Sequence, residues 1–75
     1  MPSVSDMIPV ALPEPHRRKV LRETAGLTIR QLATVVGCSH SAIARWEAGD
    51  RTPKGDRRKA YAAALAELAA LEETP

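Results

Sequence analysis

Aromatic residues, cysteine and histidine are scarce in this chain of 75 residues. There is no phenylalanine, and the aromatic residues are Trp46 and Tyr61, so the chain lacks the row of rings on which single-stranded nucleic acids stack. A single cysteine, Cys38, excludes an internal disulfide, and one cysteine with two histidines does not make a zinc-binding set. These shortages argue against a disulfide-stabilised module, a metal protein and a binder of single strands.

Long apolar runs and the usual groups of enzyme chemistry are also missing. No stretch approaches the about 18 apolar residues that cross a bilayer, and no basic-then-apolar leader opens the sequence, so we expect a cytoplasmic protein without a membrane partner. Ser39, His40 and Ser41 are adjacent, but no acid is placed to orient the histidine, and there is no glycine-rich phosphate loop. We therefore expect no catalysis and no cofactor. The length fits one small domain with a marginal core.

Positive charge is concentrated in the middle of the chain. The formal net charge is +2, but all 11 Lys and Arg residues lie between Arg17 and Lys59, where only four acidic residues occur. Three acids and no base follow Lys59. Such a layout is typical of a chain that approaches phosphates with one part and keeps the other away, although each basic residue alone fits an ordinary solvated surface equally well.

The segment 27–49 carries the strongest pattern. Its apolar residues keep helical spacing on both sides of Gly37, and they are Ile29, Leu32, Ala33, Val36, Ile43 and Trp46. The pattern predicts two short helices that cross at Ala33, where a larger side chain would force them apart. Gly37 suits the left-handed residue that ends the first helix, and Ser39 suits the N-cap of the second. Cys38, in the turn, is expected to be a small buried apolar residue rather than a redox group.

The rest of the chain predicts one helix before this segment and one after it. Residues 1–12 contain two prolines and no Lys or Arg, and we expect them to form a flexible arm that does not enter the minor groove. Asp56 is expected to cap the last helix, which is rich in alanine and leucine. We predict a compact all-α domain over residues 13–75 with four helices: one from about residue 13 to a stop at Gly26, then 28–36, 39–48 and 56–72.

These features together resemble the helix-turn-helix of phage repressor and Cro proteins, the XRE family of DNA-binding domains, over roughly residues 16–65. The matching marks are Gly26-Leu27-Thr28, Leu32-Ala33, Val36-Gly37, Ser39, Ile43 and Trp46-Glu47-Ala48-Gly49. The resemblance implies a lambda-repressor-like fold with its motif at about 28–48. It also implies sequence-specific binding to double-stranded DNA by a phage or prokaryotic transcriptional repressor or regulator.

The resemblance further implies which residues meet DNA, because it places the helix 39–48 in the major groove. The residues that would face the bases are His40, Ser41, Ala44 and Arg45. Arg45 is the strongest candidate, since its guanidinium can donate two hydrogen bonds to guanine; the competing interpretation is a surface ion pair with Glu47 or Asp50. The residues expected to contact phosphates are Thr28, Arg30, Ser39, Arg51 and Lys54.

Other basic residues and one departure complete this prediction. Long-range attraction is expected from Arg17, Arg18 and the run Arg57-Arg58-Lys59. Ile29 stands where the family often has a glutamine that contacts DNA, so that contact is weaker here, taken over by Arg30, or absent.

The remaining matches are structural. Trp46 is expected to anchor the core beside Ile43, and Arg22 with Glu47 to form a partly buried ion pair between the first helix and the recognition helix. The family usually has a fifth helix after this point, and we expect the distal apolar stripe of the last helix to lack such a cover within one subunit and to join a second copy in a homodimer. Its residues are Leu65, Leu68 and Leu71. The alternative is that these turns stay solvated or fray.

Two other functions remain open at this stage. One is an antitoxin-like or adaptor module that binds a protein partner through the last helix. The other is a recombination-directionality or architectural factor that bends DNA.

Overall fold

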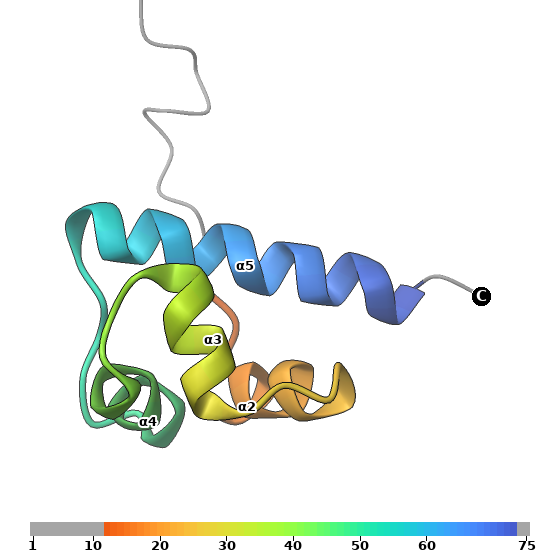
Figure 1. Cartoon of the computed structure of the whole chain (residues 1–75), viewed down its shortest axis with the longest axis horizontal. Coiled ribbons are helices and arrows are strands. Elements are labelled where there is room, and N and C mark those ends of the chain that lie inside the picture. Colours follow the sequence, from red (N-terminus) through yellow and green to blue (C-terminus); the bar gives the residue numbers. More distant parts are fainter. Residues whose placement is uncertain (1–11, 74–75) are drawn as a thin grey trace, which may run out of the picture.

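The computed structural model describes residues 12–73, which form four helices (Figure 1). They are α2 Pro15–Thr24, α3 Ile29–Val36, α4 His40–Ala48 and α5 Gly55–Glu73. No strand occurs in this part of the chain, so the prediction of a compact all-α domain of four helices is confirmed. The predicted arm lies outside the described residues, except for Leu12, which packs against the core.

The long helix α5 supports the other three helices. In Figure 1 it runs along one side of the molecule, and α2 and α3 both contact it. α4 in turn packs against α2 and α3. Because its two supporting helices are themselves anchored on α5, α4 is held firmly while one of its faces remains open to solvent.

The turn between α3 and α4 is built as the sequence predicts. Gly37 ends α3 with a left-handed φ of 83°, and its N–H donates to Ala33 O at 2.8 Å. Ser39 then caps α4, because its Oγ accepts from Ala42 N at 3.2 Å. The two caps satisfy backbone groups that the helices leave unpaired, so they fix where one helix stops and the next begins.

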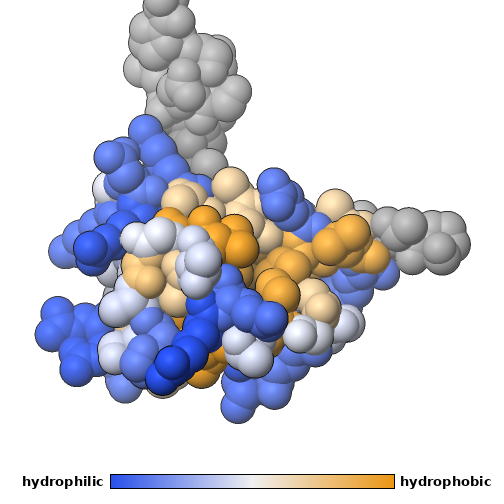
Figure 2. Space-filling model, in the orientation of Figure 1, coloured by the Kyte–Doolittle hydropathy of each residue, from blue (hydrophilic) through white to orange (hydrophobic). Residues whose placement is uncertain are grey.

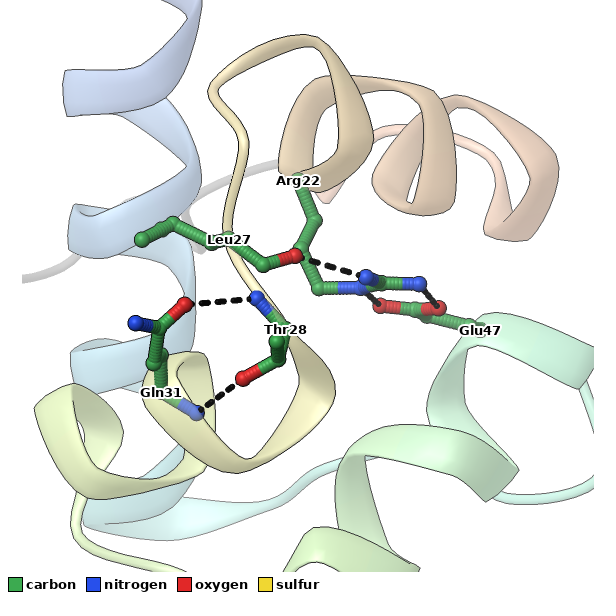
Figure 3. Close-up of polar contacts among 5 residues, drawn as sticks. All are labelled: Arg22, Leu27, Thr28, Gln31 and Glu47. Carbon is green, nitrogen blue, oxygen red and sulfur yellow. Dashed lines mark hydrogen bonds and ion pairs between the residues drawn. The ribbon is translucent and has the colours of Figure 1, made fainter.

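The start of α3 is fixed by a reciprocal pair of hydrogen bonds. Thr28 Oγ1 accepts from Gln31 N at 3.1 Å, and Gln31 Oε1 accepts from Thr28 N at 2.8 Å (Figure 3). Thr28 is therefore the N-cap of α3, and Gln31 completes a capping box. The cap of α5 differs from the prediction: Arg58 N donates to Lys54 O, so the helix starts earlier and Asp56 lies within its first turn. There its carboxylate still faces the positive end of the helix dipole.

The core lies where the four helices meet. Its largest fully buried side chains are Leu32, Ile43, Tyr61 and Leu65. The ring of Trp46 packs against that of Tyr61, with centroids 4.8 Å apart and planes tilted by 39°. Ala33, predicted to lie at the helix crossing, is also buried. Trp46 and Ile43 thus hold the inner face of α4 in the core.

Leu65 and Leu68, predicted as part of a dimer surface, belong instead to the core of a single subunit. Leu65 is 1% exposed and Leu68 is 8% exposed. Leu68 borders a small hollow beside Leu21 of α2, because α2 runs alongside the second half of α5 and covers it. Leu71, one turn further, is 65% exposed and is the only one of the three leucines left on the surface.

Tyr61 carries the one buried side-chain polar atom of the described residues that has no hydrogen-bond partner, its hydroxyl. Burial raises the pKa of Tyr61 to about 12, and the negative charge of Glu47 adds to the rise. The neutral phenol is therefore strongly favoured inside the folded domain.

An alkaline loss of stability follows from this pKa. The tyrosine of the unfolded chain ionises near pH 10, so the free energy of the unfolded state falls as the pH rises from 10 to 12, while Tyr61 stays neutral in the fold. At 1.36 kcal/mol per pKa unit, about 2–3 kcal/mol of stability should be lost over this range. Urea unfolding at a series of pH values measures it.

The matched control is Tyr61→Phe, which removes the titrating group and leaves no partner unsatisfied among the described residues. The variant should be at least as stable as the parent at neutral pH and should decline less between pH 10 and 12. Equal alkaline declines in the two proteins would contradict the assignment.

Candidate nucleic-acid interface

The outward face of α4 carries the four residues predicted to face DNA bases. Since successive helical residues are 100° apart, the burial of Ile43 and Trp46 directs the opposite side of α4 to solvent. His40, Ser41, Ala44 and Arg45 are all exposed there. These four residues came from the family resemblance, and helical spacing gave the inward positions of Ile43 and Trp46.

A groove of about 470 Å³ runs between α4 and the loop that leads into α5. It is lined by Ser39, Ser41, Ala42, Arg45, Trp46, Arg51, Thr52, Pro53, Lys54 and Arg57. Five of the predicted DNA-contacting residues therefore meet in one place, two for bases and three for phosphates. Four cationic side chains border the same groove, and its walls also offer three hydroxyl groups.

Arg57 and Thr52 border this groove although the sequence did not assign them to it. Arg57 was grouped with Arg58 and Lys59 as a source of distant attraction, and Thr52 was not singled out. The short loop between Ala48 and Gly55 explains the position of Arg57, because it keeps the start of α5 close to α4.

The other predicted contacts lie outside the groove. Arg30 and His40 border a separate hollow of about 330 Å³ beside Cys38. Ala44 borders a third hollow with Ile29, on the side facing α2. Thr28 is exposed at the start of α3, where its Oγ1 already accepts the capping hydrogen bond. The hydroxyl of Ser39 accepts a capping hydrogen bond in the same way. Both hydroxyl groups can still donate their hydrogen to a phosphate.

The ion pair predicted between Arg22 and Glu47 is present and joins α2 to α4 (Figure 3). Arg22 Nε donates to Glu47 Oε2 at 2.6 Å, and Nη2 donates to Oε1 at 3.0 Å, while Nη1 donates to Leu27 O at 2.8 Å. The two side chains are 9% and 6% exposed. The hydrogen bond to Glu47 raises the pKa of Arg22. Such a planar, two-point pair fixes the orientation of both side chains.

Comparison with known protein families identifies the family of this domain. A model described as a helix-turn-helix domain matches residues 19–74. The chain belongs to this helix-turn-helix family. A helix-turn-helix domain suggests DNA binding, and such domains are typically not catalytic. No curated protein and no solved structure matches the chain.

Ion pairing and burial decide which arginines of the helix-turn-helix domain have a positive charge available for DNA. Arg17 pairs with Glu72 at 2.6 Å, and Arg18 is buried, so neither supplies the free positive charge expected of it. Arg45 forms no ion pair with a carboxylate of the described residues, because Glu47 is held by Arg22. The surface ion pair considered for Arg45 is thus not formed, and its guanidinium is available at the groove.

Figure 2 shows hydrophilic residues at the end of the molecule where α4 and the start of α5 lie, and hydrophobic residues across the middle of this face and toward the other end of α5. Within residues 12–73 no helix has the length and apolar character to cross a membrane, and no group of three His, Cys, Asp or Glu residues is placed to hold a metal ion.

Cys38, predicted to be a small buried apolar residue, is half-buried. It follows the left-handed Gly37, so the turn leaves one side of the thiol open toward the hollow that Arg30 and His40 border. Burial nevertheless raises the pKa of the thiol. The thiolate is therefore disfavoured in the helix-turn-helix domain, as is typical of an unreactive cysteine.

Proposed function

We propose that this protein binds double-stranded DNA in a sequence-specific manner, with α4 as the recognition helix in the major groove. The observation that carries the proposal is the groove, in which Ser41 and Arg45 of α4 lie beside the cations of the next loop. Arg45 forms no ion pair with a carboxylate of residues 12–73. A major groove about 12 Å wide accepts one α-helix, and flanking cations then reach the phosphates on its edge.

Base readout is assigned to the outward face of α4. Arg45 donates two hydrogen bonds to O6 and N7 of a guanine, and Ser41 hydrogen-bonds to a neighbouring base edge. His40 contributes a ring N–H from the first turn, and Ala44 meets a thymine methyl group. Phosphates are assigned to residues on both sides of this helix, which are Thr28, Arg30, Ser39, Arg51, Lys54 and, added from the groove, Arg57.

We further propose that the protein acts as an XRE-type transcriptional repressor or regulator and as a homodimer on DNA. The exposed Leu71 and the adjoining hollow beside Thr24 and Ala25 offer a small apolar contact for the second copy. Leu65 and Leu68 contribute nothing to it, since they fill the core. Two-fold symmetry would place the half-sites about 10 base pairs apart, one helical turn.

Arg45→Ala should abolish selection of one guanine. Losing a bidentate contact costs about 1–3 kcal/mol of discrimination at that base pair and leaves the rest of the site unchanged. Selection from a randomised duplex library, followed by sequencing of the bound fraction, measures it for the parent and the variant together. Symmetry in the enriched motif would also reveal a dimer.

The matched control is Lys59→Ala, which removes a cation from an exposed position that does not border the groove. Its enriched motif should equal that of the parent. An unchanged guanine preference in Arg45→Ala would disprove the assignment of Arg45. If the parent enriches no motif, sequence-specific binding is refuted and the adaptor function becomes the better candidate.

Lys54→Ala should weaken binding to all duplexes by the same factor. Lys54 is assigned to a phosphate, so binding of the variant should release about one counterion fewer from the DNA. The slope of log K against log salt concentration should therefore become shallower by about one unit. Filter binding at several salt concentrations measures the slope. A changed base preference with an unchanged slope would contradict the phosphate role.

The shape of the bound DNA distinguishes an architectural factor from a repressor. A circular-permutation assay reports bending, and a strong bend would favour an architectural or recombination factor over a plain repressor. The antitoxin-like alternative predicts a stoichiometric protein partner that is captured without DNA.

A further inference from the structure

Arg18 is a buried cation that no role assigned above explains. The residue is 8% exposed, and no carboxylate of the described residues forms an ion pair with it. Its hydrogen bonds go to two backbone carbonyls from different parts of the chain: Nε donates to Pro13 O at 2.7 Å and Nη1 donates to Trp46 O at 2.9 Å. One side chain therefore connects the chain before α2 to the recognition helix.

The carbonyl of Trp46 lies in the last turn of α4, where backbone oxygens have no partner within the helix. The neighbouring carbonyl of Arg45 accepts from Asp50 N at 3.0 Å and from the N–H of Gly49. Arg18 supplies the donor for the next carbonyl, and its positive charge is favoured at the negative end of the helix dipole. The C-terminal end of α4 is thus held from two directions.

Arg22 lies one turn further along α2, on the same face as Arg18. It binds the side chain of Glu47, the residue after Trp46. Two buried arginines of α2 consequently hold two consecutive residues of α4, one through its backbone and one through its carboxylate. A helix held at two adjacent points, by donors of fixed geometry, cannot roll or slide freely against α2.

We propose that Arg18 is a positioning residue for the recognition helix, and that it sets the angle at which Ser41 and Arg45 face the DNA. The inference rests on the proposed function. Hydrogen bonds to base edges require side chains placed to within about 0.5 Å, which their supporting residues must provide. Because Arg18 is buried, it does not reach a phosphate, so its replacement should remove no direct phosphate contact.

The test compares Arg18→Met with Arg17→Met. Methionine fills a similar volume without the donors, and Arg17 is the matched control because it is the adjacent arginine of α2, exposed and paired with Glu72. Arg18→Met should lose roughly tenfold of the preference for the selected duplex over random duplex, about the size of one mismatched base pair. Its salt slope should equal that of the parent. Arg17→Met should keep the full preference.

The free protein supplies a second readout that needs no DNA. Residual dipolar couplings of backbone amides measure the orientation of α4 relative to α3, and they should change in Arg18→Met and remain the same in Arg17→Met. If Arg18→Met does not fold, Arg18→Lys replaces it: its single ammonium keeps the charge but not the fork that reaches both carbonyls, so a smaller change in the same direction is expected.

Two results would overturn the inference. A folded Arg18 variant with unchanged preference and unchanged α4 orientation would show that the residue positions nothing. A salt slope shallower by about one unit would show that Arg18 contacts a phosphate directly. If the parent prefers no duplex, the proposed function fails, and the dipolar couplings alone then decide the positioning role.

Discussion

Glu47→Gln is expected to lower the free energy of unfolding by about 3–5 kcal/mol, because it leaves the buried guanidinium of Arg22 without its counter-charge. Both side chains are nearly inaccessible to water, so solvent cannot compensate for the lost partner. Glutamine has nearly the same shape as glutamate, and the loss therefore reports charge rather than packing. Urea unfolding followed by the fluorescence of Trp46, the single tryptophan, measures it.

The matched control is Glu72→Gln, which breaks the exposed pair with Arg17. Side chains that are 46% and 34% exposed are well solvated, so this change should cost less than about 1 kcal/mol. The double change Arg22→Met with Glu47→Leu should recover most of the stability, since an apolar pair needs no desolvation of charge. Equal effects of Glu47→Gln and Glu72→Gln would show that burial does not govern the Arg22 pair.

The turns of this domain were predictable because their chemistry is local. A glycine at the end of α3 and hydroxyl residues before α3 and α4 satisfy backbone groups within three or four residues of themselves. The inward positions of α4 followed from helical spacing for the same reason. The pair of Arg22 and Glu47, by contrast, came from the family resemblance, since nothing in local spacing brings α2 to α4.

The errors lie where residues distant in sequence meet. Arg17 and Arg18 of α2 looked alike in the sequence, but Arg17 pairs with Glu72 and Arg18 is buried with hydrogen bonds to Pro13 and Trp46, so neither is free for DNA. Amphipathic periodicity shows which face of a helix is apolar and not which helix covers it. For that reason the sequence left the second half of α5 open, whereas α2 covers it as far as Leu68.

Leu65→Ala separates a core role from the dimer role that the sequence first suggested. Leu65 is fully buried within one subunit, so its truncation removes apolar contacts and leaves a cavity, at an expected cost of about 2–5 kcal/mol. A small domain has little stability in reserve, and the variant should be partly unfolded at room temperature.

The dependence on protein concentration decides between the two roles. Loss of a core residue lowers the unfolding midpoint equally at every protein concentration. In a dimer the midpoint of the parent rises with protein concentration, and loss of a dimer contact removes that rise. Leu71→Ala is the matched control: the same substitution in the same helix, at a side chain that is 65% exposed, should change monomer stability by less than about 0.5 kcal/mol. Thermal melts of the parent and both variants over a hundredfold range of concentration measure the difference. A midpoint for Leu65→Ala that matches the parent at low concentration and diverges at high concentration would return Leu65 to a subunit interface.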